Sequence, residues 1–241
     1  EATHRRGACG SMNFQVKSGD EANYSELPAL EQLVKMGYEY KSQSDLNNQE
    51  RSKYSEVLLY GRLENAIRKL NPNLDDDSIT DALNQIKEDS FPFSLNTMDA
   101  NQKIHAKMTG LSFDTLIPIT VEPAGESSPV LVKLFDFENV ENNDFVVTNQ
   151  FKLQGFKTPI YPDIVLFVNG IPLVIIECKS PFLPNWLESA VERENYKKYR
   201  STGNGYEKLM FYNHLLVATC GTQARHGTIS SQLEHFESSR W

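Results

Sequence analysis

The spacing of apolar residues predicts a mostly helical first half of the chain. Over 26–36 they recur every three or four positions. Ser25 precedes this stretch as a good N-cap, and Gly37 follows it where a helix C-terminus favours glycine. The same period over 57–70 predicts a second helix, which ends at Asn71 because the residue before a proline avoids the helical region. Two further helices are expected, over 78–86 and 100–108.

From residue 115 the pattern changes to short runs rich in β-branched and aromatic residues, which are typical of strands. A helical period returns after Pro184, and a last strand and helix are predicted over 215–219 and 229–241. One α/β domain over 12–241 is the simplest architecture, with a helical lobe over about 25–110 and an α/β core over about 115–241. The first five strands are expected over 115–121, 130–137, 144–153, 163–168 and 173–179.

The segment 161–179 has charged residues at its two ends and a nearly continuous apolar body. Such a body is expected for strands that are buried on both faces, so this hairpin should lie at the centre of the sheet. Asp163, Glu177 and Lys179 then lie together at one end of a buried element.

Whether the two acids face each other depends on the turn of this hairpin. A three-residue loop over 169–171 would pair Asp163 with Glu177, whereas a two-residue turn would put the two carboxylates on opposite faces. Convergence of the acids therefore requires the longer loop or a bulge. In either case Lys179 shares a face with Glu177, and Cys178 points away, because strand side chains alternate.

Two converging carboxylates repel each other unless a cation lies between them, and hard oxygen ligands suit Mg²⁺ or Mn²⁺. Such an ion could polarise a phosphate oxygen and generate hydroxide from water. Lys179 would then orient that water or stabilise the transition state as a point charge. The alternative interpretation is that Asp163, Glu177 and Lys179 are ordinary charges at a strand end, paired in water.

The net charge of −8, from 24 basic and 32 acidic residues, argues against a protein that coats nucleic acid nonspecifically. The charge is uneven, however, because four basic residues and one acid occupy 193–200. A DNA-facing strip could therefore exist within an acidic whole.

Other features bear on the cellular compartment. No run approaches the roughly 20 apolar residues of a membrane-spanning helix, and the start lacks a secretory signal, so a cytoplasmic protein without membrane contact is expected. The three widely spaced cysteines predict reduced thiols and no structural zinc. Residues 1–11 are interpreted as an expression-tag remnant, because Gly10-Ser11-Met12 resembles a protease site followed by an initiator methionine.

Pro162-Asp163 and Glu177-Cys178-Lys179 resemble the signature of the PD-(D/E)XK nuclease superfamily. More closely, the whole stretch 163–179, together with 135–137, 141–145 and 148–151, resembles the N-terminal domain of the restriction subunit (HsdR) of type I restriction-modification enzymes. The resemblance implies a restriction-endonuclease-like mixed β-sheet flanked by helices, with a helical N-terminal lobe. It also implies that Asp163 and Glu177 hold Mg²⁺ or Mn²⁺ and that Lys179 is the catalytic lysine.

Three further residues are compared with this family. Related nucleases carry a Gln-x-x-x-Tyr motif near the DNA, and the matching positions are Asn195 and Tyr199, with asparagine in place of glutamine. A polar helix face with one buried aromatic is the alternative interpretation of that pair. Glu26 matches an upstream acid that some relatives use near the metal, although a solvated glutamate at a helix start is the favoured interpretation.

The resemblance implies a type I site-specific deoxyribonuclease domain that hydrolyses phosphodiester bonds of double-stranded DNA. Motor domains in the full-length subunit would couple cutting to ATP-driven translocation, and separate methylation (M) and specificity (S) subunits would be its partners. ATP is not expected to bind this fragment, since it has no GxxxxGK[ST] phosphate loop. Two alternatives remain: a self-contained repair or restriction nuclease of the same superfamily, and a non-catalytic docking module of the same fold.

Overall fold

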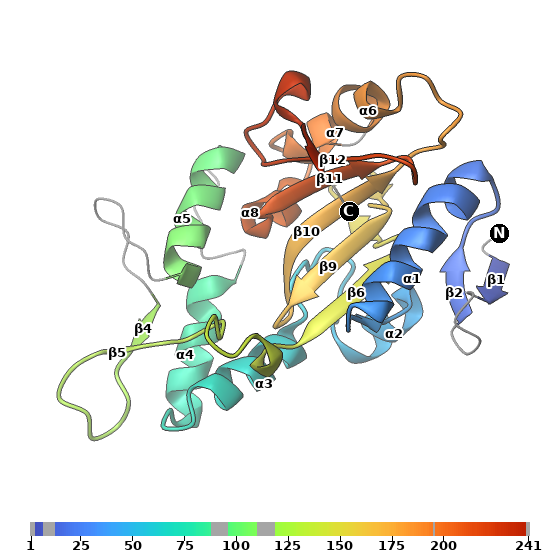
Figure 1. Ribbon diagram of the computed structural model, residues 1–241. Helices are drawn as coiled ribbons and strands as arrows, with labels where there is room; N and C mark the ends of the chain where they lie inside the picture. Colours follow the sequence, from blue (N-terminus) through green and yellow to red (C-terminus); the bar gives the residue numbers. More distant parts are fainter. Residues whose placement is uncertain (1–2, 7–12, 88–95, 110–118, 195, 240–241) are drawn as a thin grey trace.

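A seven-stranded mixed sheet forms the centre of the computed structural model, which describes residues 3–6, 13–87, 96–109, 119–194 and 196–239 (Figure 1). The strand order is β13-β12-β11-β10-β9-β6-β3. Strands β10 and β11 are parallel, as are β3 and β6, and the other neighbours are antiparallel. The seven strands are β3 (Glu39–Tyr40), β6 (Phe145–Asn149), β9 (Ile164–Val168), β10 (Ile171–Cys178), β11 (Leu215–Thr219), β12 (Ala224–Gly227) and β13 (Glu237–Ser239).

Helices flank this sheet, so the expected mixed α/β architecture is confirmed. None of the described helices is long and apolar enough to cross a membrane. The helices are α1 (Leu27–Lys35), α2 (Gln43–Gln49), α3 (Tyr60–Leu70), α4 (Asp76–Ile86), α5 (Thr97–Thr109), α6 (Trp186–Glu188), α7 (Tyr196–Arg200) and α8 (Glu207–Tyr212). Short π-helical turns cover Ala22–Glu26 and Ser189–Glu194, and 3₁₀ turns cover Val140–Asn142 and Leu233–His235. Three small antiparallel pairs complete the fold: β1 (Thr3–Arg6) with β2 (Asn13–Val16), β4 (Thr120–Val121) with β5 (Val130–Leu131), and β7 (Leu153–Gln154) with β8 (Pro159–Ile160).

The central strand β9 is buried on both faces, as its apolar sequence predicts. Ile164 and Leu166 belong to the apolar cluster under α1, which includes Leu33. Val165 and Phe167 point to the opposite face, into the larger cluster formed with the other helices. Burying an apolar side chain of this size contributes roughly 1.5–3 kcal/mol, so both clusters hold the strand in place.

The hairpin between β9 and β10 has a two-residue turn. Asn169 and Gly170 have φ angles of 51° and 79°, and Val168 pairs with Ile171 on either side of them. Positive φ at both central positions is typical of the type I′ turn that joins twisted strands. Gly170 also packs closely, because a Cβ there would lie 2.5 Å from the carbonyl oxygen of Leu59.

A β-bulge at Leu173 then corrects the register of the hairpin. The pairing shifts between Pro172 and Val174, so that Ile176 lies opposite Ile164. The next residues along the two strands are Asp163 and Glu177. Of the two devices that could bring these acids face to face, the protein uses the bulge and not the longer loop.

The first helix begins earlier than its sequence suggests. A π-helical turn at Ala22–Glu26 runs directly into α1, so Ser25 does not cap the helix. Its hydroxyl instead donates a hydrogen bond of 3.1 Å to the carbonyl of Thr219. The predicted end is confirmed, since Gly37 follows with φ 103°.

Several predicted elements differ from the structure. The helix expected over 229–241 is wrong, because 237–239 form the edge strand β13 after a single 3₁₀ turn; 240–241 lie outside the described residues. The strand expected over 144–153 is broken at Gln150, whose φ of 50° leaves the extended region. Of the strands expected over 115–121 and 130–137, short pairs remain at 120–121 and 130–131, and 115–118 lie outside the described residues. Helices α2 and α8 and strand β12 were not predicted.

Candidate active site

The structure brings Asp163, Glu177 and Lys179 together at the C-terminal end of β10. Their exposed fractions are 8%, 0% and 6%. They are therefore buried and not solvated charges at a strand end. Cys178 between them belongs to the apolar cluster on the α1 side, as the alternation of the strand predicts. Cys178 and Cys220 are buried and are not joined in a disulfide; Cys9 lies outside the described residues.

Two hydrogen bonds fix the carboxylate of Asp163. The backbone N–H of Cys178 donates to Asp163 Oδ2 at 2.8 Å, and the side-chain amide of Gln150 donates to Asp163 Oδ1 at 3.2 Å. The backbone of Gln150 also donates to the carbonyl of Asp163 at 2.8 Å. The direction in which Asp163 presents its oxygens is thus set by two neighbouring strands.

Glu177 has a strongly perturbed acidity. Complete burial raises its pKa well above the ordinary value, and the charge of Asp163 and a hydrogen bond with that residue raise it further. The charge of Lys179 and a hydrogen bond from the hydroxyl of Tyr199 lower the pKa of Glu177 in part. Burial and the nearby Glu177 raise the pKa of Tyr199, so its hydroxyl remains a donor.

Lys179 is held between acids. Its ammonium lies 3.7 Å from Glu21 Oε2, and its charge acts on Glu177. Its backbone N–H donates to the carbonyl of Thr219 at 2.8 Å, which continues the pairing of β10 with β11. The lysine therefore projects from the end of an ordered strand.

The interpretation of Glu26 as a solvated glutamate at a helix start is wrong, because only 3% of this residue is exposed. Asn149 donates to Glu26 Oε1 at 2.7 Å, and Gln150 approaches the same oxygen at 3.4 Å. Burial and the charge of Asp163 raise the pKa of Glu26 to about 7, although the two amides oppose this rise. Sequence analysis assigned no role to Asn149 or Gln150, although both lie in 148–151, one of the stretches that resemble the restriction-subunit family.

Of the two positions that match the Gln-x-x-x-Tyr motif, the structure describes Tyr199. Tyr199 on α7 is 2% exposed and reaches Glu177, whereas Asn195 lies outside the described residues. The tyrosine is thus a buried aromatic, as the alternative interpretation has it, and also a neighbour of the acids.

A divalent ion such as Mg²⁺ needs hard oxygen ligands, and two carboxylates lie at the end of β10. Among the described residues, no group of three or more His, Cys, Asp or Glu side chains lies as a ready metal site. Mg²⁺, however, is commonly bound by one or two carboxylates with water and substrate oxygens as the remaining ligands. Gln150 Oε1 adds a buried acceptor to which no described residue donates a hydrogen bond. Asp163, Glu177 and this oxygen fit a partly hydrated ion of this kind.

A cavity of about 340 Å³ opens beside these residues. It is lined by Gln150 and Asn149, by Gln15 and Lys17 from the segment of β2, and by Tyr161. Among the described residues that line it, none has a carboxylate. Tyr161 is 44% exposed, and the ammonium of Lys17 lies 5.8 Å from its ring centroid.

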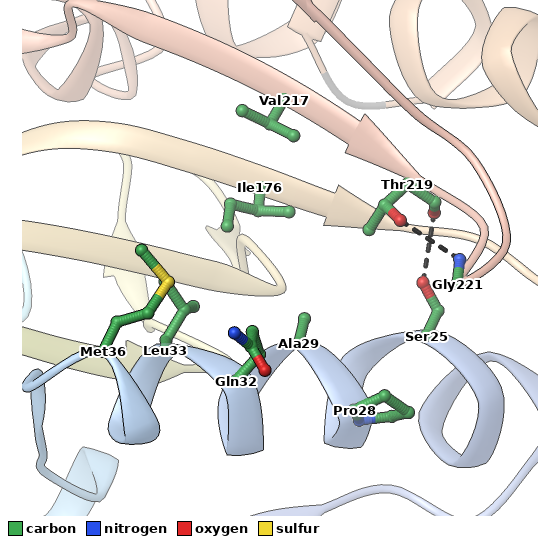
Figure 2. A pocket seen from close by; sticks show the side chains of 10 residues that line it. All are labelled: Ser25, Pro28, Ala29, Gln32, Leu33, Met36, Ile176, Val217, Thr219 and Gly221. Atoms are coloured by element: carbon green, nitrogen blue, oxygen red, sulfur yellow. Dashed lines mark hydrogen bonds between the residues drawn. The ribbon is translucent and has the colours of Figure 1, made fainter. Parts of the chain in front are cut away.

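A second cavity, of about 460 Å³, lies between α1 and the strands β10 and β11 (Figure 2). Its lining is mostly apolar, with Leu33 and Met36 on the helix and Ile176 and Val217 on the strands. Figure 2 shows its hydroxyl groups at one end, engaged in hydrogen bonds around Thr219. No described side chain that lines this cavity is an acid or a base.

The protein has a mixed sheet with helices on both faces, and two acids and a lysine lie at the end of one central strand. It is therefore an α/β domain with a buried ionic centre. Residues 19–235 match the family described as the N terminus of the type I restriction enzyme R protein. The chain belongs to this family, as the sequence resemblance indicates.

Curated relatives agree with this assignment. The chain is 30% identical over 223 residues to the type I restriction enzyme HindI endonuclease subunit of Haemophilus influenzae, covering 89% of this chain and 20% of the relative. It is 27% identical over 230 residues to the putative type I restriction enzyme MjaIXP endonuclease subunit of Methanocaldococcus jannaschii, covering 93% and 21%. The chain thus spans about one fifth of the length of these relatives.

Proposed function

We propose that this domain is a PD-(D/E)XK endonuclease that hydrolyses phosphodiester bonds of double-stranded DNA with Mg²⁺ or Mn²⁺. The proposal is supported by one observation: Asp163, Glu177 and Lys179 are buried and lie together, because the bulge in β10 sets the register of the hairpin. A structural role alone would not need two acids beside each other out of water, since buried carboxylates without a cation are costly.

Each residue of the site has a distinct task in this proposal. Asp163 and Glu177 would hold the ion, and Tyr199 would keep Glu177 oriented through its hydrogen bond. A bound divalent ion supplies Lewis acidity, which polarises a phosphate oxygen and makes a water ligand more acidic. Lys179 would orient the attacking water or offset the negative charge that develops on the phosphorus oxygens.

DNA would approach along the cavity that Lys17, Gln150 and Tyr161 line beside Asp163. In a chain with a net charge of −8, a lining of amides, Lys17 and the half-exposed Tyr161 is the part of the site that least repels phosphate. The lysine can neutralise a phosphate, and the tyrosine can stack on a base.

The relatives are named as endonuclease subunits, and this chain matches about one fifth of their length. We propose that in the full-length subunit cutting is coupled to ATP-dependent DNA translocation by the remaining sequence. Methylation and specificity subunits would join it in the restriction complex and read the target site.

Nicking of supercoiled plasmid with Mg²⁺ or Mn²⁺ tests the proposal. Asp163→Asn and Lys179→Ala should each reduce cleavage by about 100-fold or more, in the range seen when one transition-state stabiliser is removed. Lys133→Ala is the matched control, because Lys133 is exposed and lies on another part of the fold. Calorimetric titration with Mn²⁺ accompanies each variant. A folded wild type that binds no Mn²⁺ and cuts no DNA would leave the docking module as the better function.

A further inference from the structure

Gln150 occupies an unusual backbone position directly after β6. Its φ of 50° lies in the left-handed region. Among the described residues, the other non-glycine residue with such a φ is Asn169 in the hairpin turn. Such a conformation costs about 1–3 kcal/mol and persists where the surrounding structure holds it. Unlike Asn169, Gln150 is in no tight hairpin turn that would explain the strain.

The strained backbone directs the side chain of Gln150 between two acids. Its Nε2 lies 3.2 Å from Asp163 Oδ1 and 3.4 Å from Glu26 Oε1. A single amide therefore spans the carboxylate at the start of β9 and the carboxylate at the start of α1. Without this donor the two buried acids would face each other with less compensation for their repulsion.

The opposite end of the same amide is incomplete. Gln150 Oε1 is buried and accepts no hydrogen bond from any described residue. A buried acceptor without a donor is uncommon and calls for an explanation such as a water or an ion. Gln150 also lines the cavity beside Asp163, through which such a group could enter.

We infer that Gln150 is a positioning residue for the metal: its amide fixes Asp163 against Glu26 before the ion arrives, and its free oxygen receives a hydrogen bond from the hydration shell of the bound ion. The inference rests on the proposed function. Partners that orient metal ligands in this way change metal affinity by about 10–100-fold when they are lost.

The test uses two glycine variants at positions of the same backbone conformation. Gln150→Gly removes the amide and relieves the strain, since glycine enters positive φ without penalty. Asn169→Gly is the matched control, because Asn169 has φ 51° and lies at the turn, the other end of β9 from Asp163. Measurements are Mn²⁺ affinity by calorimetry, kcat and KM for plasmid cleavage, and the thermal midpoint.

Gln150→Gly should bind Mn²⁺ about tenfold more weakly and have a lower kcat, while its KM for DNA and thermal midpoint are kept. Asn169→Gly should lower the midpoint, because Asn169 donates to the carbonyl of Leu134 at 2.7 Å, and should leave Mn²⁺ affinity unchanged. Wild-type Mn²⁺ affinity and kcat in Gln150→Gly would overturn the inference.

A metal-free measurement separates this inference from the proposed function. In the NMR spectrum of the wild type, the side-chain NH₂ of Gln150 should exchange slowly with solvent, and its signals should move in Asp163→Asn. If these signals behave as expected but no Mn²⁺ binds, the proposed function fails, while the hydrogen bond from Gln150 to Asp163 is confirmed. A fast-exchanging NH₂ that is insensitive to Asp163→Asn would show that Gln150 does not hold Asp163, and would overturn the inference.

Discussion

The buried hydroxyl of Tyr199 donates a hydrogen bond to Glu177, which links helix α7 to the acids at the end of β10. Tyr199→Phe removes this donor and leaves the ring. Because the bond lowers the pKa of Glu177, its loss should raise that pKa further and shift the pH profile of cleavage to higher pH. Cleavage at neutral pH should fall by about 10-fold, since a hydrogen bond to a charged group is worth about 1.5–3 kcal/mol.

Plasmid nicking measured between pH 6 and pH 9 checks this expectation. Tyr196→Phe is the neighbouring control, because Tyr196 is fully buried on α7 but its hydroxyl donates to the backbone carbonyls of Val217 and, at 3.2 Å, Ile175. An unchanged pH profile in Tyr199→Phe contradicts the assignment of this hydrogen bond to the site.

Metal binding should release protons. Burial and Asp163 hold the pKa of Glu177 well above its ordinary value, so in the metal-free protein Glu177 keeps its proton at pH values where an exposed glutamate is ionised. A cation must displace that proton, and Mn²⁺ affinity should rise with pH by up to about tenfold per pH unit for one proton. Calorimetry in buffers of different ionisation enthalpy counts the protons released. Equal Mn²⁺ affinity at pH 5.5 and pH 8 is incompatible with this account.

Glu26 should make the folded state less stable at high pH. Its pKa is raised from 4.5 to about 7, so its carboxyl binds a proton more tightly in the folded protein than in the unfolded chain. The resulting stabilisation is complete below pH 4.5 and is lost as pH rises through about 7. At about 1.4 kcal/mol per pH unit, the loss amounts to about 3 kcal/mol.

Urea unfolding of metal-free wild type and Glu26→Gln at pH 5 and pH 8 measures this effect. The free energy of unfolding should fall less between these pH values in Glu26→Gln than in the wild type. Glu64→Gln controls for the general effect of removing an acid, because the side chain of Glu64 on α3 is 42% exposed and pairs with Arg68 away from the site. If both variants follow the pH dependence of the wild type, Glu26 does not carry it.

The cavity beside Asp163 should contribute to DNA affinity through Lys17 and Tyr161. Lys17→Ala should weaken binding and reduce the slope of log affinity against log salt by about 1, as expected for one lost phosphate contact. Tyr161→Ala should weaken binding by about 10-fold through lost stacking, and Tyr161→Phe should retain it. Fluorescence anisotropy with duplex DNA, without divalent metal, measures both. Wild-type affinity in Lys17→Ala and Tyr161→Ala places the DNA elsewhere.

The part of the site that the sequence predicts is local. Asp163, Glu177 and Lys179 belong to one hairpin, and alternation along a strand decides which side chains share a face. The burial of Glu26 and the position of Gln150 depend on contacts between α1 and the end of β6, which are far apart in the chain. No local period encodes such contacts. The bulge at Leu173 was expected only as one of two possibilities, because neither the loop nor the bulge has a separate signal.

The error near the C-terminus has a similar cause. Ile229 and Phe236 are buried, and their spacing is compatible with a helix. In the structure, residues 237–239 do not form a helix, and their backbone pairs with β12 at the edge of the sheet. A short segment with few apolar residues does not distinguish a helix from an edge strand, so the tertiary pairing decides.

Because of the bulge at Leu173, Asp163 and Glu177 face each other only if the number of residues between them is odd. Thirteen residues, 164–176, separate Asp163 from Glu177, whereas a regular hairpin with a two-residue turn places an even number between opposed residues. Loss of one residue from the hairpin can therefore be tolerated at Leu173, where it would only straighten the strand. Elsewhere in β9 or β10 the same loss would exchange inside for outside along the rest of the strand. Single-residue deletions in members of this family should accordingly gather at this bulge.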